Sequence, residues 1–459
     1  MRKSKLIKAI GLGLLSVGSI TTLASCSIEK LFVLGGGLDF DASGLETFDG
    51  TENALFFALY NYYGYEGQHF TNKWLGMNDA LKAHGITVTG YEGNKDAKTF
   101  KIKREANCDL PEDAVIYMVN NQNWDPGIQY KTPFAKYKPM AVISTCNGVE
   151  FAADPIKSSG MHISNATMAG FSDVYKDAFE QGTLTYLSAK YAAHILPIIK
   201  ACVDAVDNGS AMRNADGTAL SLSIENWAIQ TLAEYEKMEK VDSIDKEHPT
   251  LRNVNIDQFF DKSNPNYGAE NLSKWVSDSS KENITALYEL NGTNEASDTV
   301  RQGRRLKCGI LAPSSVNDQV QKYIDYINGY CSYIYNLEIV TYPVTSSNTQ
   351  DIGATALCSQ KCDFIISLQD DTNRNKSIQN ANKAGVYYGI AGTTQNPIDY
   401  ELVKNLPYYV GSIGTSIDEE RRAAREMTEY YLQCMIHRAK GDLAQWQTEY
   451  KGLTSEKED

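Results

Sequence analysis

The chain has 459 residues and a formal net charge of −13 at pH 7, and 42% of its residues are hydrophobic. This length is sufficient for two domains with buried cores. Binding of nucleic acid requires basic patches that neutralise phosphates, so the acidic balance argues against that class of partner. After the first 25 residues, no segment is long and apolar enough to span a membrane.

The N-terminal residues have the order of a lipoprotein signal. Basic residues within the first eight positions precede an apolar, glycine-rich stretch over 9–20, and Leu-Ala-Ser-Cys follows. The stretch is shorter than the roughly 20 residues of a spanning helix, and the four-residue pattern is the one that a bacterial lipoprotein peptidase cleaves. We expect residues 1–25 to be removed as a signal peptide and Cys26 to carry the lipid, anchoring the protein to the extracellular face of the cell membrane.

Eight further cysteines are spread along the chain, at 108, 146, 202, 308, 331, 358, 362 and 434. No pair has CxxC spacing, and no histidine lies near Cys358 and Cys362, so no metal site is predicted. Buried free thiols are the favoured interpretation, since free cysteine packs as a small apolar residue. One or two disulfides are the alternative, because exported proteins form them.

A glycine- and serine-rich linker is predicted over 26–53, followed by a first α/β lobe over 54–205. Its predicted elements are strands at 54–63, 86–88, 114–119, 140–144 and 161–166, a helix on which Trp74, Met77 and Leu81 recur and which ends at Gly85, and a helix over 178–194 broken by Pro197. The alternation of strands and helices predicts a parallel sheet covered on both faces.

The polar stretch 206–306 breaks this alternation, and we interpret it as an insertion or connection with helices at 232–238 and 271–276. A second α/β lobe is expected over 307–407, with strands at 307–311, 337–344, 363–367 and 386–390 and helices around 320–327, 352–357 and 378–384, the first ended by Gly329 and the last by Gly385. Residues 408–459 are predicted to form a return strand and a long helix, 418–439, that pack on the first lobe.

Catalytic and nucleotide-binding signatures are missing from the sequence, so neither an enzyme nor a cofactor is predicted. Open parallel sheets bind ligands at the carboxyl ends of their strands. The candidate ligand-binding residues at these ends are Phe70, Trp74, Asn121, Asn123, Trp124, Asp125, Asn147, Asp370, Asp371, Asn373 and Thr393. Rings with fixed amides and carboxylates suit a polyhydroxylated or heterocyclic ligand. As alternatives, Asp371 and Asn373 cap a helix, and Trp124 packs in a turn.

Four passages resemble type I solute-binding proteins of ABC importers. They are FTNKWLGMNDALKAHGITV, AFEQGTLTYLSAKYAAHI, NLEIVTYPVTSSNTQDIGATALCSQKCDFIISL and VYYGIAGTTQNPIDYELVKNLPYYVGSIGTS. Their pattern and order are most similar to the basic-membrane-protein branch, whose characterised members bind nucleosides. The resemblance covers roughly 54–205 and 306–453, and it implies the type I periplasmic-binding-protein fold, with two Rossmann-like lobes and parallel sheets.

The resemblance also implies a function. A lipid-anchored protein of this family captures a small polar ligand, here a nucleoside or a sugar, between its lobes and delivers it to a membrane permease and its ATPase. The chain departs from the family at 389–393, where the family has an aspartate, and at 414–415, where it has a lysine. A second hypothesis therefore stays open: a surface lipoprotein of the same fold that acts in adhesion or sensing.

Overall fold

The computed structural model describes part of the chain. The described residues are 56–57, 67–89, 101–111, 116–119, 141–144, 162–169, 171, 173–182, 184–242, 251–278, 298–314, 318–345, 347–368 and 373–450. The predicted signal peptide, Cys26 and the linker over 26–53 lie outside these ranges. Within them, no helix is both long and apolar enough to cross a membrane.

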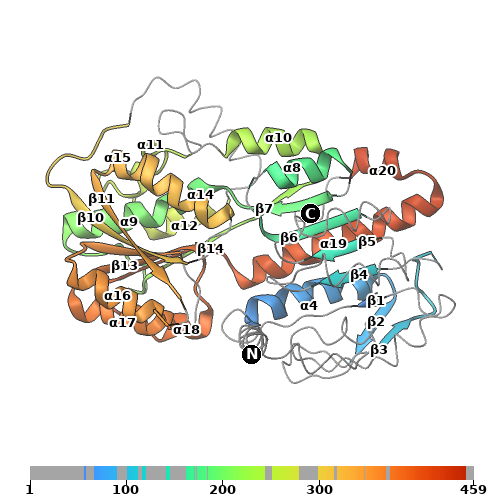
Figure 1. The fold of residues 1–459 in the computed structure, drawn as a ribbon, viewed down its shortest axis with the longest axis horizontal. Helices are drawn as coiled ribbons and strands as arrows, with labels where there is room; N and C mark the ends of the chain where they lie inside the picture. Colours follow the sequence, from blue (N-terminus) through green and yellow to red (C-terminus); the bar gives the residue numbers. More distant parts are fainter. Residues whose placement is uncertain are drawn as a thin grey trace, which may run out of the picture.

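The first sheet has six strands, all parallel except one edge strand (Figure 1). In spatial order they are β1 (Phe56–Phe57), β4 (Ile116–Val119), β5 (Ala141–Ser144), β6 (His162–Ala169), β7 (Leu184–Ala189) and β9 (Trp227–Ile229). Only β9 runs antiparallel, against β7. The strands predicted over 114–119, 140–144 and 161–166 are confirmed.

The strand predicted at 86–88 exists but does not join this sheet. As β2 (Ile86–Thr89) it pairs antiparallel with β3 (Lys101–Arg104) in a separate two-stranded sheet. Its sequence, Ile-Thr-Val-Thr, alternates apolar and polar residues. Alternation is typical of a half-exposed antiparallel strand, whereas a strand buried on both faces has a continuous apolar run. The helix before it, α4 (Gly67–Ala83), is confirmed, with Gly85 left-handed just beyond its end.

The second sheet is wholly parallel and also has six strands. Their spatial order is β11 (Leu337–Val344), β10 (Leu306–Pro313), β12 (Phe364–Ser367), β13 (Tyr387–Thr393), β14 (Tyr409–Thr415) and β8 (Leu220–Ile224). All four strands predicted over 307–407 are confirmed, as are the helices α16 (Gln350–Ser359) and α17 (Arg374–Ala384). Mixed α/β architecture with parallel sheets is therefore established.

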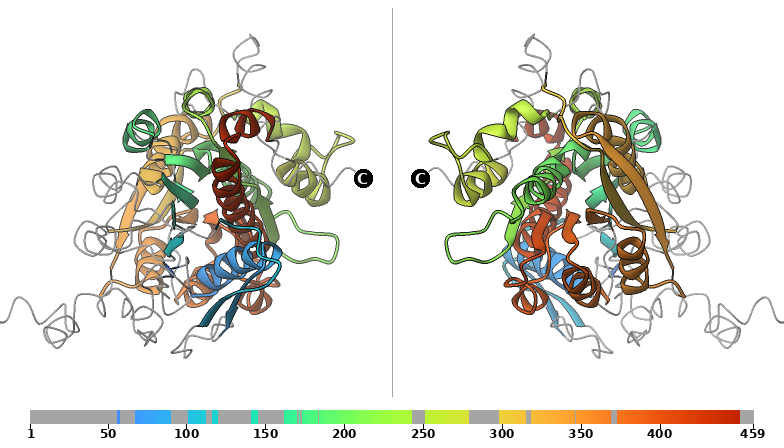
Figure 2. Two further views of the ribbon diagram at one scale, coloured as in Figure 1. Left: turned by 90° about the vertical axis from the view of Figure 1, so that its right-hand side faces the viewer. Right: turned by 90° about the vertical axis from the view of Figure 1, so that its left-hand side faces the viewer.

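Residues 408–459 divide between the two sheets. The return strand β14 lies inside the second sheet, between β13 and β8, and so the prediction that it packs on the first lobe was wrong. The long helix α19 (Ile417–Lys440) does pack beside α4 of the first unit (Figures 1 and 2). Gly76 permits this approach, since a Cβ there would fall 2.0 Å from the carbonyl oxygen of Arg421.

The stretch 206–306 is not only an insertion, because it supplies β8 to the second sheet and β9 to the first. The alternation Leu-Ser-Leu-Ser-Ile in β8 is a strand signal that the polar surroundings obscure. The two predicted helices are confirmed as α10 (Leu232–Val241) and α12 (Ala269–Ser277). The shorter α11 (Asn253–Ile256) and η2 (Asp257–Phe259) lie between them.

The single helix predicted over 178–194 was wrong. The chain forms α8 (Asp173–Glu180), then β7, then the one-turn η1 (Ala192–Ile195) and α9 (Leu196–Asn208). Gly182, with φ +70°, follows the end of α8, and Pro197 lies in the first turn of α9 instead of breaking a helix. Proline suits this position because the first amides of a helix have no intrahelical partner.

Gly329 does not end its helix as predicted. The helix continues from α14 (Asp318–Tyr326) through a π-helical turn, η3 (Ile327–Cys331), into α15 (Ser332–Ile334). Tyr330 and Cys331 are buried beyond the glycine, so the apolar face continues past it. Tertiary packing thus outweighs the modest helix propensity cost of one glycine. The helix finally ends before Asn336, which is left-handed with φ +53°.

The described cysteines are all free thiols, as favoured from the sequence, and none is fully exposed. Burial raises the pKa of Cys202 above its usual range and that of Cys362 to about 11, so both thiols stay protonated. Cys202 lies on α9 against the second sheet, where a Cβ on Gly389 would come within 2.9 Å of its sulfur. These thiols therefore serve as core residues.

Candidate functional site

Three crossovers between the sheets bring the carboxyl ends of strands from both units together. They are 190–191 after β7, 225–226 after β8 and Ser416 after β14. Because ligands bind at the carboxyl ends of parallel strands, the crossovers mark the candidate site. The site is built from five residues beside them, here called the crossover site: Lys190, His194, Gln319, Tyr323 and Gly392.

His194 provides a fixed hydrogen-bond acceptor. Its Nδ1 donates to the carbonyl oxygen of Tyr191 at 2.5 Å, which leaves Nε2 unprotonated. Burial, reinforced by the nearby Lys190 ammonium, lowers the pKa of His194 to about 3, so the ring is neutral. Nε2 is buried and has no hydrogen-bond partner among the described residues.

Tyr323 and Gln319 lie one turn apart on α14. The Tyr323 ring packs edge-on against His194, with ring centroids 5.3 Å apart. Burial raises the pKa of Tyr323 well above its usual value, outweighing the opposite influence of Gln319, so its hydroxyl stays protonated. In the described part of the chain, this hydroxyl and the Gln319 side-chain nitrogen and oxygen have no hydrogen-bond partner outside their own pair. Buried polar atoms without partners are rare and costly, so the cluster points to a ligand or ordered water.

Lys190 and Gly392 join the first crossover to the end of β13. The Lys190 ammonium donates to the carbonyl oxygen of Gly392 at 3.3 Å. Gly392 has φ +96°, a backbone conformation that favours glycine. A side chain there would also clash, because a Cβ would lie 2.8 Å from Cε2 of Tyr323. Thr393, a predicted ligand residue, follows directly and pairs in register with Thr415 of β14.

An aromatic stack supports the crossovers from the first unit. Tyr191 lies nearly parallel to Trp227 at the start of β9, with centroids 5.0 Å and planes 14° apart. Phe171, after β6, packs against the same indole at 5.9 Å. Tyr191 also lies edge-on to His194, with ring centroids 5.5 Å apart, so the stack restricts the side chains that flank His194.

Asp242 holds the backbone of η1. It is buried, and its carboxylate accepts from the Ala192 amide at 2.6 Å and from the Lys322 ammonium at 3.1 Å. Burial raises the pKa of Asp242, and the two donors oppose this rise. Lys322 is on α14, so this pair fixes α14 against the first crossover and with it the relative position of Tyr323 and His194.

Polar side chains along the carboxyl edge of the second sheet bond mainly to one another. Gln350 Nε2 donates to Ser367 Oγ at 2.6 Å and to the Tyr388 hydroxyl at 2.9 Å. Gln395 Nε2 donates to Asn375 Oδ1 at 2.6 Å. These bonds link α16 to β12 and β13, and they connect the segment that follows β13 to α17.

Most residues predicted to bind ligand cannot be placed. Asn121, Asn123, Trp124, Asp125, Asn147, Asp370 and Asp371 lie outside the described residues, and Phe70 and Trp74 lie on α4 with side chains that are not described. Asn373 occupies the N-cap position of α17, but its side chain makes no capping hydrogen bond. The structure thus places only Thr393 beside the crossover site, and the ligand role of all these residues stays a prediction.

Sequence reasoning missed the crossover site itself. The helix predicted over 178–194 contains both Lys190 and His194, and neither is among the candidate ligand-binding residues predicted from the sequence. One available signal was Lys190, a formally charged residue within the mostly apolar run 184–199, since lysine is almost never fully buried without a partner. No comparable signal distinguishes Gln319 or Tyr323, which become neighbours of His194 only through the fold.

No family model matches the chain, and no curated protein matches it. Among solved structures, a solute-binding protein of an ABC transporter from R. palustris in complex with benzoate is 8% identical, with a TM-score of 0.41, over 85% of this chain and 82% of that chain. A second solute-binding protein, from Rhodopseudomonas palustris HaA2 with p-hydroxybenzoic acid, is 11% identical, with a TM-score of 0.37, over 84% and 80%. The D-lactate dehydrogenase of Escherichia coli has a TM-score of 0.22 at 11% identity, over 84% and 97%. With TM-scores below 0.5, these similarities carry no argument about function.

Proposed function

We propose that the protein is an extracytoplasmic solute-binding lipoprotein of an ABC-type importer. Two sheets joined by three short crossovers can close over a solute, which stabilises the closed form through contacts with both units. The observation that carries the proposal is the group of buried polar atoms at the crossovers that have no described partner outside the group: His194 Nε2, the Tyr323 hydroxyl and the Gln319 amide. The solute would then pass to a membrane permease and its ATPase.

The chemistry of these atoms favours a neutral, hydroxyl-bearing solute. His194 Nε2 accepts, the Tyr323 hydroxyl and Gln319 nitrogen donate, and the Gln319 oxygen accepts. Each hydroxyl of a sugar or of a ribose both donates and accepts, so it matches this mixture. Nucleosides and sugars are therefore the two ligand classes proposed, with Thr393 and the other predicted residues completing the site.

Ligand screening by thermal shift and calorimetry, with nucleoside and sugar panels, tests the proposal. A ligand present at 100 times its Kd stabilises the folded protein by about 2.7 kcal/mol. Tyr323→Phe and Gln319→Leu should weaken binding about tenfold or more, while the free variants keep or gain stability because an unpaired buried polar group is removed.

Tyr326→Phe is the matched control on the same helix. Its hydroxyl donates to the carbonyl oxygen of Leu251 at 2.7 Å, away from the crossover site. This variant should lose about 1 kcal/mol of stability and keep its affinity. Failure of every panel member to bind the wild-type protein would overturn the proposal.

Membrane attachment is tested separately. Metabolic labelling with a radioactive fatty acid should label the wild-type protein, and Cys26→Ser should remove the label and release the protein from the membrane fraction. Adhesion or sensing is the second candidate function. In that case the polar stretch 206–306 would be the contact surface, and this interpretation is weakened because β8 and β9 of the stretch belong to the two sheets.

A further inference from the structure

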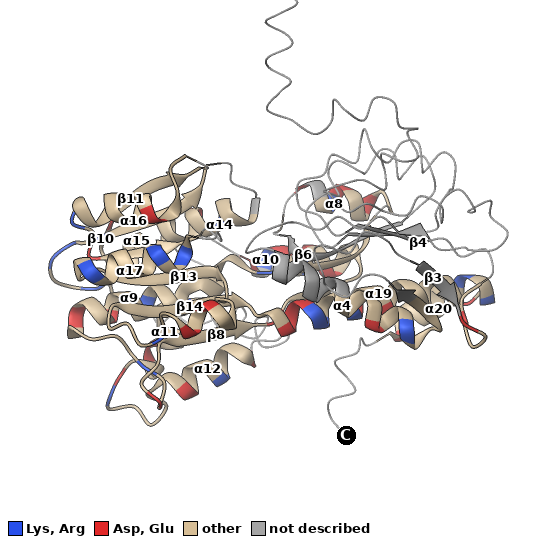
Figure 3. Cartoon of the chain, turned by 90° about the horizontal axis from the view of Figure 1, so that it is seen from below, with Lys and Arg blue, Asp and Glu red and all other residues tan. Residues whose placement is uncertain are grey.

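A basic groove lies at the opposite edge of the second sheet from the crossovers, where β10 and β11 begin. It has a volume of about 420 Å³ and is lined by residues that include Val300, Arg301, Arg305, Tyr333, Asn336 and Leu337. We call it the arginine groove. Its basic character is unexpected in a chain with a formal net charge of −13. In Figure 3 the basic residues near the start of β10 lie at the outer end of this sheet.

Two neighbouring arginines are neutralised by bidentate ion pairs. Arg301 donates to Asp207 through Nε at 2.8 Å and Nη2 at 2.5 Å. Arg304 donates to Asp363 through Nη1 at 2.8 Å and Nη2 at 2.6 Å. Asp207 lies on α9 and Asp363 just before β12, so the positive charges of Arg301 and Arg304 are balanced locally.

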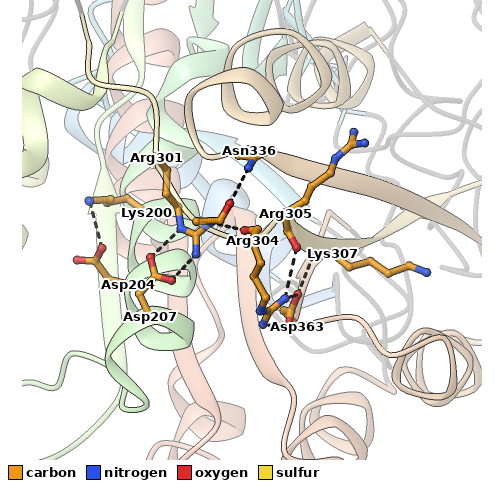
Figure 4. A network of polar contacts seen from close by, with 10 residues as sticks. Lys200, Asp204, Asp207, Arg301, Arg304, Arg305, Lys307, Asn336 and Asp363 are labelled. Carbon is orange, nitrogen blue, oxygen red and sulfur yellow. Dashed lines mark hydrogen bonds and ion pairs between the residues drawn. The ribbon is translucent and has the colours of Figure 1, made fainter.

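Arg305 differs from both. Its guanidinium points away from the two ion pairs (Figure 4) and donates to the carbonyl oxygen of Leu337 at 3.1 Å. Among the described residues, no carboxylate forms an ion pair with it. The main-chain contact fixes the direction of the guanidinium, and the remaining N–H groups can form the bidentate contact that arginine makes with a carboxylate or phosphate.

Tyr333 provides an apolar surface beside this charge. It is 54% exposed, although it is a large aromatic residue on α15. Leu337 and Val300 complete the apolar part of the lining, and Asn336 donates to the carbonyl oxygen of Gly303 at 3.4 Å, which holds the turn in its left-handed conformation. The groove volume falls within the roughly 300–1,000 Å³ range of small-molecule sites.

We propose that the arginine groove binds an organic anion, a carboxylate or phosphate attached to an aromatic or apolar group. The anionic oxygens bond to Arg305, and the ring packs on Tyr333. This site is separate from the crossover site, so its occupant does not compete with the transported solute. A free metabolite or an acidic residue beside an aromatic side chain in a protein segment would present the same chemistry.

Titration followed by NMR on the wild-type protein tests this site, with phenyl phosphate and phenylacetate as probes. Both should shift the resonances of Tyr333 and Asn336, and inorganic phosphate should bind at least tenfold more weakly because it lacks the ring. The dipeptide Phe-Glu with blocked termini tests the protein-segment source: binding as tight as phenylacetate supports that source, and weaker binding favours the free metabolite.

Arg305→Gln and Tyr333→Ala should each weaken phenyl phosphate binding at least tenfold. Arg304→Gln is the matched control, because it removes the same charge from the next residue without lining the groove, and it should change affinity less than threefold. Circular dichroism of each variant separates lost binding from lost folding. Equal effects of the two arginine substitutions, or no shift with any probe, would overturn the proposal.

Discussion

The backbone amide of Asn226 donates to the carboxylate of Glu419 at 2.9 Å, across 193 residues of sequence. Asn226 lies in the second crossover, and Glu419 is in the first turn of α19, just after the third. The same carboxylate accepts two bonds from Arg422, both at 2.6 Å. The contact thus connects two crossovers directly, and its geometry limits how they move relative to each other.

Replacing Glu419 should destabilise the protein. Glu419→Ala leaves a buried amide without its acceptor and removes one partner of Arg422, so we expect a loss of about 2–3 kcal/mol in the free energy of unfolding. Urea denaturation of the wild type and the variant measures this loss of free energy. Glu401→Ala, which removes an exposed pair with Lys404, is the control and should cost at most about 0.5 kcal/mol. Equal effects of the two substitutions would show that the crossover contact is unimportant.

A second prediction concerns pH and His84. This buried imidazole is held between Glu429, 2.8 Å from Nε2, and Asp109, 2.9 Å from Nδ1. Burial opposes the charged form, but the two carboxylates outweigh it and raise the pKa of His84. The pKa of His84 in the folded protein is above its unfolded value of about 6.5. Protonated His84 therefore stabilises the fold fully below pH 6.5, and this stabilisation is lost as pH rises through the folded pKa.

The free energy of unfolding of the wild type and of His84→Gln should be measured between pH 5.5 and 9. The difference between the two proteins gives the contribution of charged His84. The comparison is needed because His194, with its lowered pKa, changes wild-type stability in the opposite direction as pH falls below 6.5. The stability advantage of the wild type should be largest at pH 5.5 and decline toward pH 9. A constant difference across this range contradicts a charged His84.

Second-sheet strands could be predicted because buried parallel strands leave a local signal. Phe-Ile-Ile-Ser in β12 is a short apolar run, and Gly385 marks the end of the helix that follows. The helix predicted over 178–194 failed because Leu184, Leu187 and Tyr191 also recur at helical spacing. The strand forms there because the helix has already ended before Gly182, and burial of the run between β6 and β9 of the first sheet is a tertiary effect.

The candidate site was predictable only in outline. Strand carboxyl ends indicated the edge of the second sheet at which the crossovers lie, and Thr393 is beside the crossover site. The polar atoms themselves come from η1 and α14, which are more than 120 residues apart in sequence and meet only through the crossovers. A buried histidine that packs and one that presents an acceptor to a ligand look the same in sequence.

A third prediction tests the close contact of α4 with α19. Gly76→Ala places a methyl group 2.0 Å from the Arg421 carbonyl oxygen, on the backbone of α19, so the helices must separate. We expect a net loss of about 1–3 kcal/mol in unfolding free energy, after the better helix propensity of alanine is included. Lys82→Ala, exposed on the same helix, should change stability by less than about 0.5 kcal/mol. Stability unchanged by Gly76→Ala would contradict this packing.

The final prediction concerns the protonation of His194. Because its Nδ1 donates to a carbonyl and its pKa is about 3, the ring should remain neutral with Nε2 unprotonated from pH 5 to 8. Nitrogen-15 NMR of the imidazole distinguishes this form from the other tautomer and from imidazolium. Lys190→Met should leave the ring neutral, since burial is the larger cause of the low pKa. A bound solute that donates to Nε2 should shift that nitrogen alone, and titration of His194 near pH 6.5 would refute the fixed acceptor on which the crossover site depends.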